Sequence, residues 1–187
     1  MLKNHKAIFL DRDGVINYDY GYVGTIERFV FFPKIFEHLK KFKDLGYLLI
    51  IVTNQGGVSL KKFSQEDFFK LNEHMLNMLS QNGVEILDVF YSFYHPKNPS
   101  EFLEHKNLRK PKPDMILKAA EKHNIDLENS YLIGDKDTDI EAGEKAGLKY
   151  NFLLHTNKKN KIGKDQTKHE LFKSISSIVK YIRNDNN

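Results

Sequence analysis

Short runs of apolar residues alternate along this chain with stretches of helical spacing, and this alternation limits the possible folds more than any other feature. The runs lack the polar alternation of half-buried strands, so we expect strands that are buried on both faces. Strands separated by helices favour a parallel sheet with helices on both sides. The predicted strands are Ala7 to Leu10, Leu48 to Thr53, Val89 to Phe93, Tyr131 to Gly134 and Tyr150 to Leu154.

Start and stop signals place helices between these strands. Pro33 and Gly46 enclose the first helix, and Ser64 with Asp67 predicts a capping box for the second. The apolar stripe near the C-terminus predicts a core-packing helix. The predicted helices run from about Pro33 to Leu45, from Ser64 to Gly83, from Asp114 to His123, from Asp139 to Ala146 and from Glu170 to Arg183.

Size and composition narrow the class of protein. A length of 187 residues with 40% hydrophobic residues predicts one folded domain over 1–187, and the absence of cysteine excludes disulfides and thiolate chemistry. The net charge of +4 permits phosphorylated ligands, but no basic block predicts nucleic-acid binding. The longest apolar run, Tyr47 to Val52, is too short to cross a membrane. We expect a cytoplasmic monomer without a membrane partner.

Two acidic residues directly follow the first predicted strand, in the segment Asp-Arg-Asp-Gly. Because open α/β sheets bind ligands at the carboxyl ends of strands, we expect Asp11 and Asp13 to share one crevice, with Arg12 facing away. Two such carboxylates repel each other, so they require a cation or one protonated partner. Gly14 permits a sharp turn after them. A calcium loop is excluded, since Tyr22 stands where that loop requires Glu.

Polar residues also follow the second strand and precede the third helix. Thr53, Asn54 and Gln55 would place a hydroxyl and two amides at the same sheet edge, where they suit phosphate oxygens. Arg109 and Lys110 precede a Pro-Lys-Pro-Asp helix start. They would therefore add fixed cations to a helix N-terminus, which already attracts anions.

The last charged segment, Gly-Asp-Lys-Asp-Thr-Asp, follows the fourth predicted strand. Asp135, Asp137 and Asp139 have the spacing of a calcium loop, but Ile140 stands where that loop requires glycine. At a helix start these acids also complement the helix dipole.

In this order the four segments resemble the four motifs of the haloacid dehalogenase-type phosphohydrolases, over residues 7 to about 156. Asp-Arg-Asp-Gly-Val-Ile-Asn, Asp-Tyr-Gly-Tyr-Val, Thr-Asn-Gln and Arg-Lys-Pro-Lys-Pro are similar to a subgroup that includes phosphatases of heptose bisphosphates and of histidinol phosphate. The resemblance implies a three-layer Rossmann-like α/β fold around a central parallel sheet, with a minimal cap loop at about 94–108.

The same resemblance implies a mechanism and a metal. Asp11 would be the nucleophile that forms an aspartyl-phosphate, and Asp13 would protonate the leaving group and then activate water. Thr53 and Lys110 would stabilise the transferring phosphoryl group. Mg²⁺ would be held by the carboxylates of Asp11 and Asp135 and a backbone oxygen of Asp13.

The resemblance also implies residues for substrate binding and for support of the site. Asp139 would orient a lysine or loop amides without touching the substrate. The residues expected to contact and select a small phosphorylated sugar are Asp19, Tyr20, Gly21, Tyr22, Asn54, Gln55, Gly56, Arg109 and Lys136.

One departure from the subgroup concerns zinc, which its members usually bind through Cys-x-His and Cys-x-Cys before Arg-Lys-Pro. Here these positions read Ser92-Phe93-Tyr94 and Lys106-Asn107-Leu108, so we expect no structural zinc. His95 and His105 lie nearby in the sequence but are too few to predict a metal site.

Two alternatives to a heptose bisphosphate phosphatase remain open at this stage. Histidinol phosphate is the other substrate in the subgroup, although its phosphatases lack the Asp-Tyr-Gly-Tyr-Val segment. A receiver-type regulatory domain also places Asp, Thr and Lys at successive strand ends, but it lacks the second acid and the Gly-Asp element. Catalytic release of phosphate would distinguish an enzyme from such a domain.

Overall fold

The protein is described by a computed structural model that covers residues 4–154 and 171–185. At its centre lies a six-stranded sheet in the order β3-β2-β1-β4-β5-β6, with every neighbouring pair parallel. The strands are Ala7–Leu10 (β1), Leu48–Asn54 (β2), Asp88–Ser92 (β3), Tyr131–Gly134 (β4), Tyr150–Leu154 (β5) and Leu171–Phe172 (β6). The predicted α/β fold with a central parallel sheet is confirmed, and β1, β4 and β5 have the predicted bounds.

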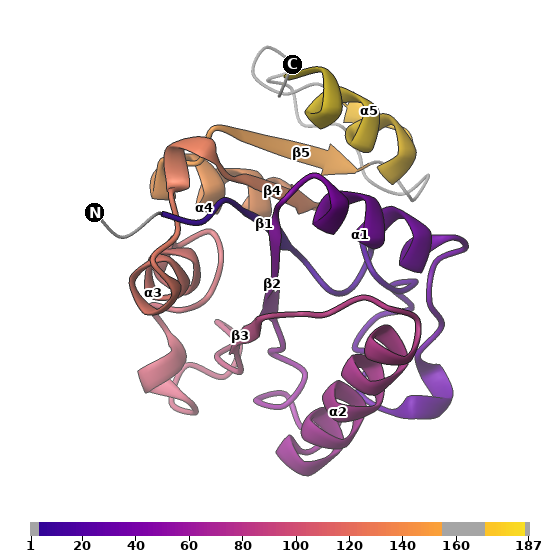
Figure 1. The fold of residues 1–187 in the computed structure, drawn as a ribbon. Coiled ribbons are helices and arrows are strands. Elements are labelled where there is room, and N and C mark those ends of the chain that lie inside the picture. The colour runs from indigo at the N-terminus through magenta and orange to yellow at the C-terminus, as the bar shows by residue number, and fades with distance from the viewer. Residues whose placement is uncertain (1–3, 155–170, 186–187) are drawn as a thin grey trace.

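Helices cover both faces of the sheet and complete three layers (Figure 1). One layer contains α1 (Ile35–Asp44), α2 (Gln65–Gln81) and α5 (Ile175–Asp185), and the other contains α3 (Asp114–His123) and α4 (Asp137–Ala146). Short 3-10 helices span Ile26–Arg28, Leu103–His105 and Leu127–Asn129. Within the described ranges, no helix is both long and apolar enough to cross a bilayer.

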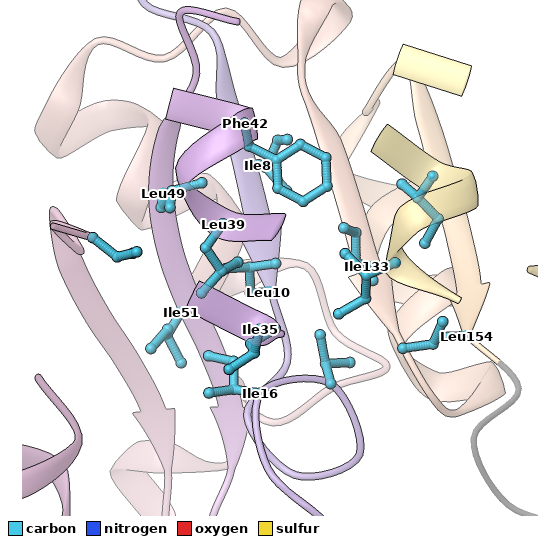
Figure 2. Close-up of a cluster of buried hydrophobic side chains, with 14 of the residues drawn as sticks. Ile8, Leu10, Ile16, Ile35, Leu39, Phe42, Leu49, Ile51, Ile133 and Leu154 are labelled. Atoms are coloured by element: carbon cyan, nitrogen blue, oxygen red, sulfur yellow. The ribbon is translucent and has the colours of Figure 1, made fainter. Parts of the chain in front are cut away.

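The side chains of β1 point alternately into the two layers. Ile8 and Leu10 belong to the core on the side of α1, where Figure 2 shows Ile8 beside Phe42 and Leu10 beside Leu39. Ala7 and Phe9 belong to the core under α3 and α4. A strand buried on both faces has no position that faces water, which explains its unbroken apolar run.

The start of α2 and the end of α4 follow the predicted signals. Ser64 Oγ accepts the amide hydrogen of Asp67 at 3.0 Å, and the Asp67 carboxylate accepts the amide hydrogen of Ser64 at 2.9 Å. Gly147 ends α4 in a left-handed conformation, with φ of +81°. α4 begins at Asp137, two residues earlier than predicted, because the Asp139 carboxylate accepts the amide hydrogen of Lys136 and so occupies the first turn.

The C-terminal segment differs from the single helix predicted from Glu170 to Arg183. Glu170 lies outside the described residues, Leu171–Phe172 is a strand beside β5, and the helix covers Ile175–Asp185. The Ser174 side chain caps the helix by accepting the amide hydrogen of Ser177 at 3.3 Å. The prediction failed because the same apolar stripe is consistent with a single helix and with a short strand followed by a helix.

A third apolar cluster, here called the aromatic cluster, shares no residue with the two main cores. Its rings come from the segment before α2, from α2, from β3 and the residue after it, and from the 94–108 loop. Phe93 is central, with its ring centroid 5.1 Å from that of Phe68 and 5.4 Å from that of Phe102. The cluster consists of Val58, Phe63, Phe68 and Phe93, with Tyr91 and Phe102 packed against them.

Candidate active site

The strand order reverses at β1, and the acidic residues lie at this reversal. From β1 the chain continues to β2 and β3 on one side, and then to β4, β5 and β6 on the other. Asp11 follows β1 and Asp135 follows β4, while the amide of Asp11 donates to the carbonyl of Ile133 at 2.9 Å. Because ligands of open α/β sheets bind at such a point, the structure places the first and fourth segments where a ligand site is expected.

Lys110 brings the third segment into the same place. Its side chain is buried, and its ammonium donates to the carbonyl of Val52 at 2.7 Å. The ammonium also lies 3.0 Å from Oδ1 of Asp11 and 2.6 Å from Oδ1 of Asp139. An ammonium has three protons, so these three partners use all of them. Asn54 holds the backbone of Lys110 through two hydrogen bonds of 3.0 Å.

The buried charges set the protonation of this cluster. Burial alone would raise the pKa of Asp11, but Lys110 and Lys136 outweigh it and hold that pKa below its usual value. Burial opposes the charge of Lys110 too, yet the carboxylates of Asp11 and Asp139 raise its pKa. Asp11 is therefore ionised at neutral pH, in the form that can attack phosphorus or bind a metal.

Asp135 provides the second carboxylate of a possible cation site. Burial, followed by the negative charge of Asp11, raises the pKa of Asp135 to about 8. Oxygens of Asp11, Asp135 and Asp139 lie within 4.8 Å of one another, and Asp139 is paired with Lys110. Crowded carboxylate oxygens of this kind fit Mg²⁺. Gly14 leaves room for them, since a Cβ there would lie 2.2 Å from Oδ2 of Asp135.

Asp13 lies beside this cluster, and side chains hold its carboxylate from several directions. Its Oδ2 accepts from Gln55 Nε2 at 2.8 Å and from Arg12 Nη2 at 2.9 Å. Its Oδ1 accepts from Asn17 Nδ2 at 2.9 Å. Gln55 Nε2 also donates to the hydroxyl of Thr53 at 2.9 Å. As expected, Arg12 lies outside the pocket lining. Its guanidinium is buried and pairs with Asp13, however, which strand alternation does not predict because β1 ends before Arg12.

A pocket of about 520 Å³ adjoins these residues. Asp11, Thr53 and Asp135 are buried and do not belong to its lining, and Tyr20 is an exposed residue whose ring stacks on Tyr18. The structure thus does not bring Tyr20 into the pocket. The predicted site residues that do line the pocket are Asp13, Asp19, Gly21, Tyr22, Asn54, Gln55, Gly56, Arg109, Lys110 and Lys136.

Sequence reasoning missed part of this lining. The sequence indicates only a loop residue at His95, but His95 lies so near Gly56 that a Cβ on the glycine would be 2.8 Å from the imidazole Cδ2. The only signal for it is a His-Pro pair at the start of the loop, which does not reveal that the loop folds over Gly56. The lining residues that were not predicted are Gly57, Phe63, His95, Pro96, Pro111 and Thr138.

Residues 19–24, here called the substrate loop, form one wall of the pocket. Arg28 holds this loop from outside, with hydrogen bonds to the carbonyls of Tyr20 at 3.1 Å and Gly21 at 3.0 Å. Asp19 faces Lys136, whose ammonium lies 3.2 Å from one of its carboxylate oxygens and 3.4 Å from Asp135. Lys136 therefore connects the loop with the buried carboxylates.

The 94–108 loop contributes His95 and Pro96 to the pocket lining, and it contains no cysteine. His105 Nδ1 accepts the amide hydrogen of Phe93 at 3.0 Å, and the carbonyl of His105 accepts from Ser92 Oγ at 2.9 Å. The imidazole also stacks on the ring of Phe93. At the end of the loop, Arg109 donates to the carbonyl of Tyr94 at 3.0 Å. Contacts within the protein thus join both ends of this loop.

Curated proteins match this chain over most of its length. A protein of Pasteurella multocida named D-glycero-beta-D-manno-heptose-1,7-bisphosphate 7-phosphatase is 40% identical over 179 residues, which are 95% of this chain and 97% of that protein. A protein of Burkholderia mallei named as the phosphatase of the alpha form is 44% identical over 154 residues, or 82% and 81% of the two chains. A sequence model of HAD-hydrolase-like proteins matches residues 107–176.

Solved structures share the fold. A putative HAD-like phosphatase of Mesorhizobium loti superposes with a TM-score of 0.83 at 26% identity, covering 97% of this chain and 87% of the other. The D,D-heptose 1,7-bisphosphate phosphatase of B. bronchiseptica, complexed with magnesium and phosphate, gives 0.82 at 22% identity, covering 96% and 99%. With the four motifs and their meeting point, these matches show that the chain belongs to the D-glycero-D-manno-heptose-1,7-bisphosphate 7-phosphatase family of haloacid dehalogenase-like hydrolases.

Proposed function

We propose that this protein is a magnesium-dependent phosphatase that removes the 7-phosphate of D-glycero-D-manno-heptose 1,7-bisphosphate and leaves the heptose 1-phosphate. The single observation that most supports this reaction is the buried set of Asp11, Lys110 and Asp135 beside a pocket whose lining includes two further cations. Arg109 and Lys136 provide those cations. A substrate with two phosphates suits such a pocket.

In the first half-reaction, an ionised oxygen of Asp11 attacks phosphorus. The bond between phosphorus and the sugar oxygen breaks, its electron pair moves to that oxygen, and Asp13 gives it a proton. The charge of Lys110 and the hydroxyl of Thr53 would stabilise the phosphoryl oxygens, and electrostatic stabilisation of this kind is the main contribution to phosphoryl transfer.

In the second half-reaction, water attacks the phosphorus of the aspartyl-phosphate. Asp13 takes a proton from that water, the bond from phosphorus to Asp11 breaks, and inorganic phosphate leaves. The carboxylates of Asp11 and Asp135 would hold Mg²⁺ together with a backbone oxygen of Asp13. When bound, this ion supplies positive charge to the phosphate oxygens. Asp139 supports the site by its contacts with Lys110 and the amide of Lys136.

We further propose that the reaction takes place in the cytoplasm and serves the formation of nucleotide-activated heptose for surface polysaccharide. Two further features belong to this proposal: the protein acts as a monomer, and it contains no structural zinc. The contacts of His105 with Ser92 and Phe93 support the second, because they join the ends of the loop at or directly beside positions where the subgroup usually has zinc ligands. Elemental analysis that finds one tightly bound zinc per chain would contradict it.

Phosphate release from a small panel of substrates tests the proposed function. The panel contains the α and β anomers of the heptose 1,7-bisphosphate and histidinol phosphate, each with Mg²⁺ and with a chelator. We expect magnesium-dependent turnover of at least one bisphosphate and much slower release from histidinol phosphate, whose ammonium is repelled by the pocket cations. A preference for histidinol phosphate would identify that compound as the substrate in place of the heptose bisphosphate. A single stoichiometric phosphorylation without turnover would show that the protein is not an enzyme.

A further inference from the structure

Arg12 is the largest fully buried side chain in the described part of the chain. It stands between the two acids of the first segment, and its one ion-pair partner there is Asp13. Its Nε and Nη2 donate to Oδ1 of Asp13 at 3.3 Å and 3.1 Å, and Nη2 also reaches Oδ2 at 2.9 Å. A buried guanidinium is costly unless an anion faces it, so this fork commits Arg12 to Asp13.

The same guanidinium also contacts the substrate loop. Arg12 Nη2 donates to the carbonyl oxygen of Val23, eleven positions further along the chain. One nitrogen therefore contacts both the carboxylate of Asp13 and the backbone of the pocket wall. Its Nη1 is buried and has no hydrogen-bond partner within the described ranges. An unpaired buried N–H group costs free energy. The guanidinium tolerates this cost at Nη1 and keeps the contacts of Nη2 with Asp13 and with the carbonyl of Val23.

The other side chains that hold Asp13 do not make this connection. Asn17 donates to Asp13 and to the carbonyl of its neighbour Tyr18, and Gln55 donates to Asp13 and Thr53. Arg12 is outside the pocket lining, so it has no direct access to a ligand there. The side chain of Arg12 can therefore influence the reaction only through its two partners, Asp13 and the substrate loop.

We propose that Arg12 is a positioning residue that couples the orientation of the Asp13 carboxyl to the position of the substrate loop. This inference rests on the proposed function, in which Asp13 gives a proton to the departing sugar oxygen. When substrate occupies the pocket, the loop carbonyl of Val23 fixes the guanidinium, and the guanidinium fixes the carboxyl that must reach the leaving oxygen. The loop and the acid are thereby aligned through one planar group.

The leaving group provides a test that a general loss of structure does not imitate. A sugar alkoxide is strongly basic and needs a proton as it departs, whereas a 4-nitrophenolate is stable without one. The ratio kcat/KM includes only steps up to departure of the leaving group, so hydrolysis of the aspartyl-phosphate does not contribute. A misplaced Asp13 must therefore lower kcat/KM for the sugar phosphate and hardly change it for 4-nitrophenyl phosphate.

The experiment compares Arg12→Lys with wild type on the heptose 1,7-bisphosphate and on 4-nitrophenyl phosphate. Lysine keeps the charge but loses the planar fork. Since general acid catalysis is worth about 10²–10⁴-fold, we expect kcat/KM for the bisphosphate to fall by about ten- to a hundredfold and that for the aryl phosphate by less than about threefold. Preserved aryl phosphatase activity shows in the same sample that the variant is folded. If Arg12→Lys does not fold, Arg12→Gln replaces it in the comparison.

Two further variants separate the possible outcomes. Asp13→Asn must show the same selective loss, and equal losses on both substrates would refute the proton-donor role of Asp13 in the proposed function. If Asp13→Asn is selective and neither Arg12 variant is, the positioning role of Arg12 is overturned. Arg28→Lys is the matched control, because Arg28 holds the substrate loop without contacting Asp13. Arg28→Lys is expected to change kcat/KM for both substrates by similar factors. A loss confined to the bisphosphate would show that mobility of the substrate loop alone misplaces Asp13, and this would overturn the direct role of Arg12.

Discussion

The ammonium of Lys110 lies 2.6 Å from Oδ1 of Asp139, and both side chains are almost completely buried. The two residues come from different segments, one before α3 and the other in the first turn of α4. Because a buried ammonium is strongly destabilised without a facing anion, this pair keeps the cation next to Asp11.

Replacement of Asp139 by asparagine is therefore expected to lower both stability and turnover. The variant keeps the shape of the side chain but removes one of the two anions that face Lys110, and breaking a buried pair costs about 3–5 kcal/mol. Urea unfolding and kcat measure the two effects. Asp137→Asn is the matched control, since Asp137 is exposed in the same helical turn and its loss should cost less than about 1 kcal/mol. Equal effects of the two substitutions would contradict this role for the pair.

Replacement of Asp11 by asparagine is expected to abolish turnover. An amide is neither a nucleophile nor an anionic metal ligand, so both the aspartyl-phosphate and tight magnesium binding are lost. Asp13→Asn should retain the first step on an activated phosphate ester, whose leaving group needs no proton, while hydrolysis of its aspartyl-phosphate becomes slow. Steady-state phosphate release, with magnesium in excess, measures turnover of both variants, and the initial release of 4-nitrophenolate measures the first step. Near-normal activity of Asp11→Asn would refute the proposed mechanism.

Gly14→Ala is expected to impair the carboxylate site more than the fold. A Cβ at Gly14 would lie 2.2 Å from Oδ2 of Asp135, and φ at this position is +92°. Gly46 has a similar φ of +85°, but a Cβ there would meet no atom within 4 Å, so Gly46→Ala adds the same backbone strain without the clash. The backbone strain should cost both variants about 1–2 kcal/mol of stability. Only Gly14→Ala, whose methyl group also displaces Asp135, should lose magnesium-dependent activity. Calorimetric titration with Mg²⁺ compares them, and equal magnesium affinities would contradict the expectation.

Arg109→Ala is expected to weaken recognition of the second phosphate. Arg109 lines the pocket, and its Nη1 is held by the carbonyl of Tyr94. Loss of a hydrogen bond to a charged group should raise the activation free energy for the bisphosphate by roughly 1.5–3 kcal/mol, and kcat/KM falls accordingly. Small monophosphate esters should change much less, because they lack the second phosphate. Equal losses on both kinds of substrate would mean that Arg109 acts at the reacting phosphate.

Acidification is expected to destabilise the 94–108 loop through His105. Burial lowers the pKa of His105, and its Nδ1 must stay unprotonated to accept the amide hydrogen of Phe93. The unfolded chain therefore binds more protons than the folded one below about pH 6.5. The contribution of neutral His105 to stability is present above that pH and is lost as the pH falls through the folded-state pKa. Unfolding free energies between about pH 5 and 8, for wild type and His105→Gln, measure it. The slope below about pH 6.5 should be smaller in the variant, and identical slopes would exclude His105 as the cause.

The sequence predicted those parts of the fold and the site that depend on local pattern. Strands β1 and β4 were bounded correctly because their apolar runs end at Asp11 and Asp135, where the polar sheet edge begins. The rule that ligands bind at this edge accounts for Asp11 and Asp135, whereas Lys110 was added by the resemblance to the haloacid dehalogenase-type phosphohydrolases. The structure brings the ammonium of Lys110 to 3.0 Å from Asp11. The sequence could not predict that the Arg12 side chain pairs with Asp13, because side-chain alternation no longer applies once the strand has ended.

Other failures have the same origin in contacts between distant parts of the chain. Tyr20 shares a sequence segment with residues of the substrate loop that line the pocket, but a turn directs its ring to Tyr18. His95 reaches the pocket only because the 94–108 loop folds over Gly56. Residues 171–172 form a strand because β5 offers them a partner, which no local spacing could indicate.

The separation of the aromatic cluster from the two main cores affects how the protein loses structure. Its rings join α2 to the 94–108 loop, whereas the central strands are buried in the other two clusters. Cooperative units of unfolding follow such divisions of packing, so the loop wall is expected to open in partial unfolding events that leave the sheet intact. Amide hydrogens near Phe102 should then exchange with solvent much faster than those of β1 and β4. The enzyme would exchange ligands by transient local opening while the carboxylates at the sheet edge stay assembled.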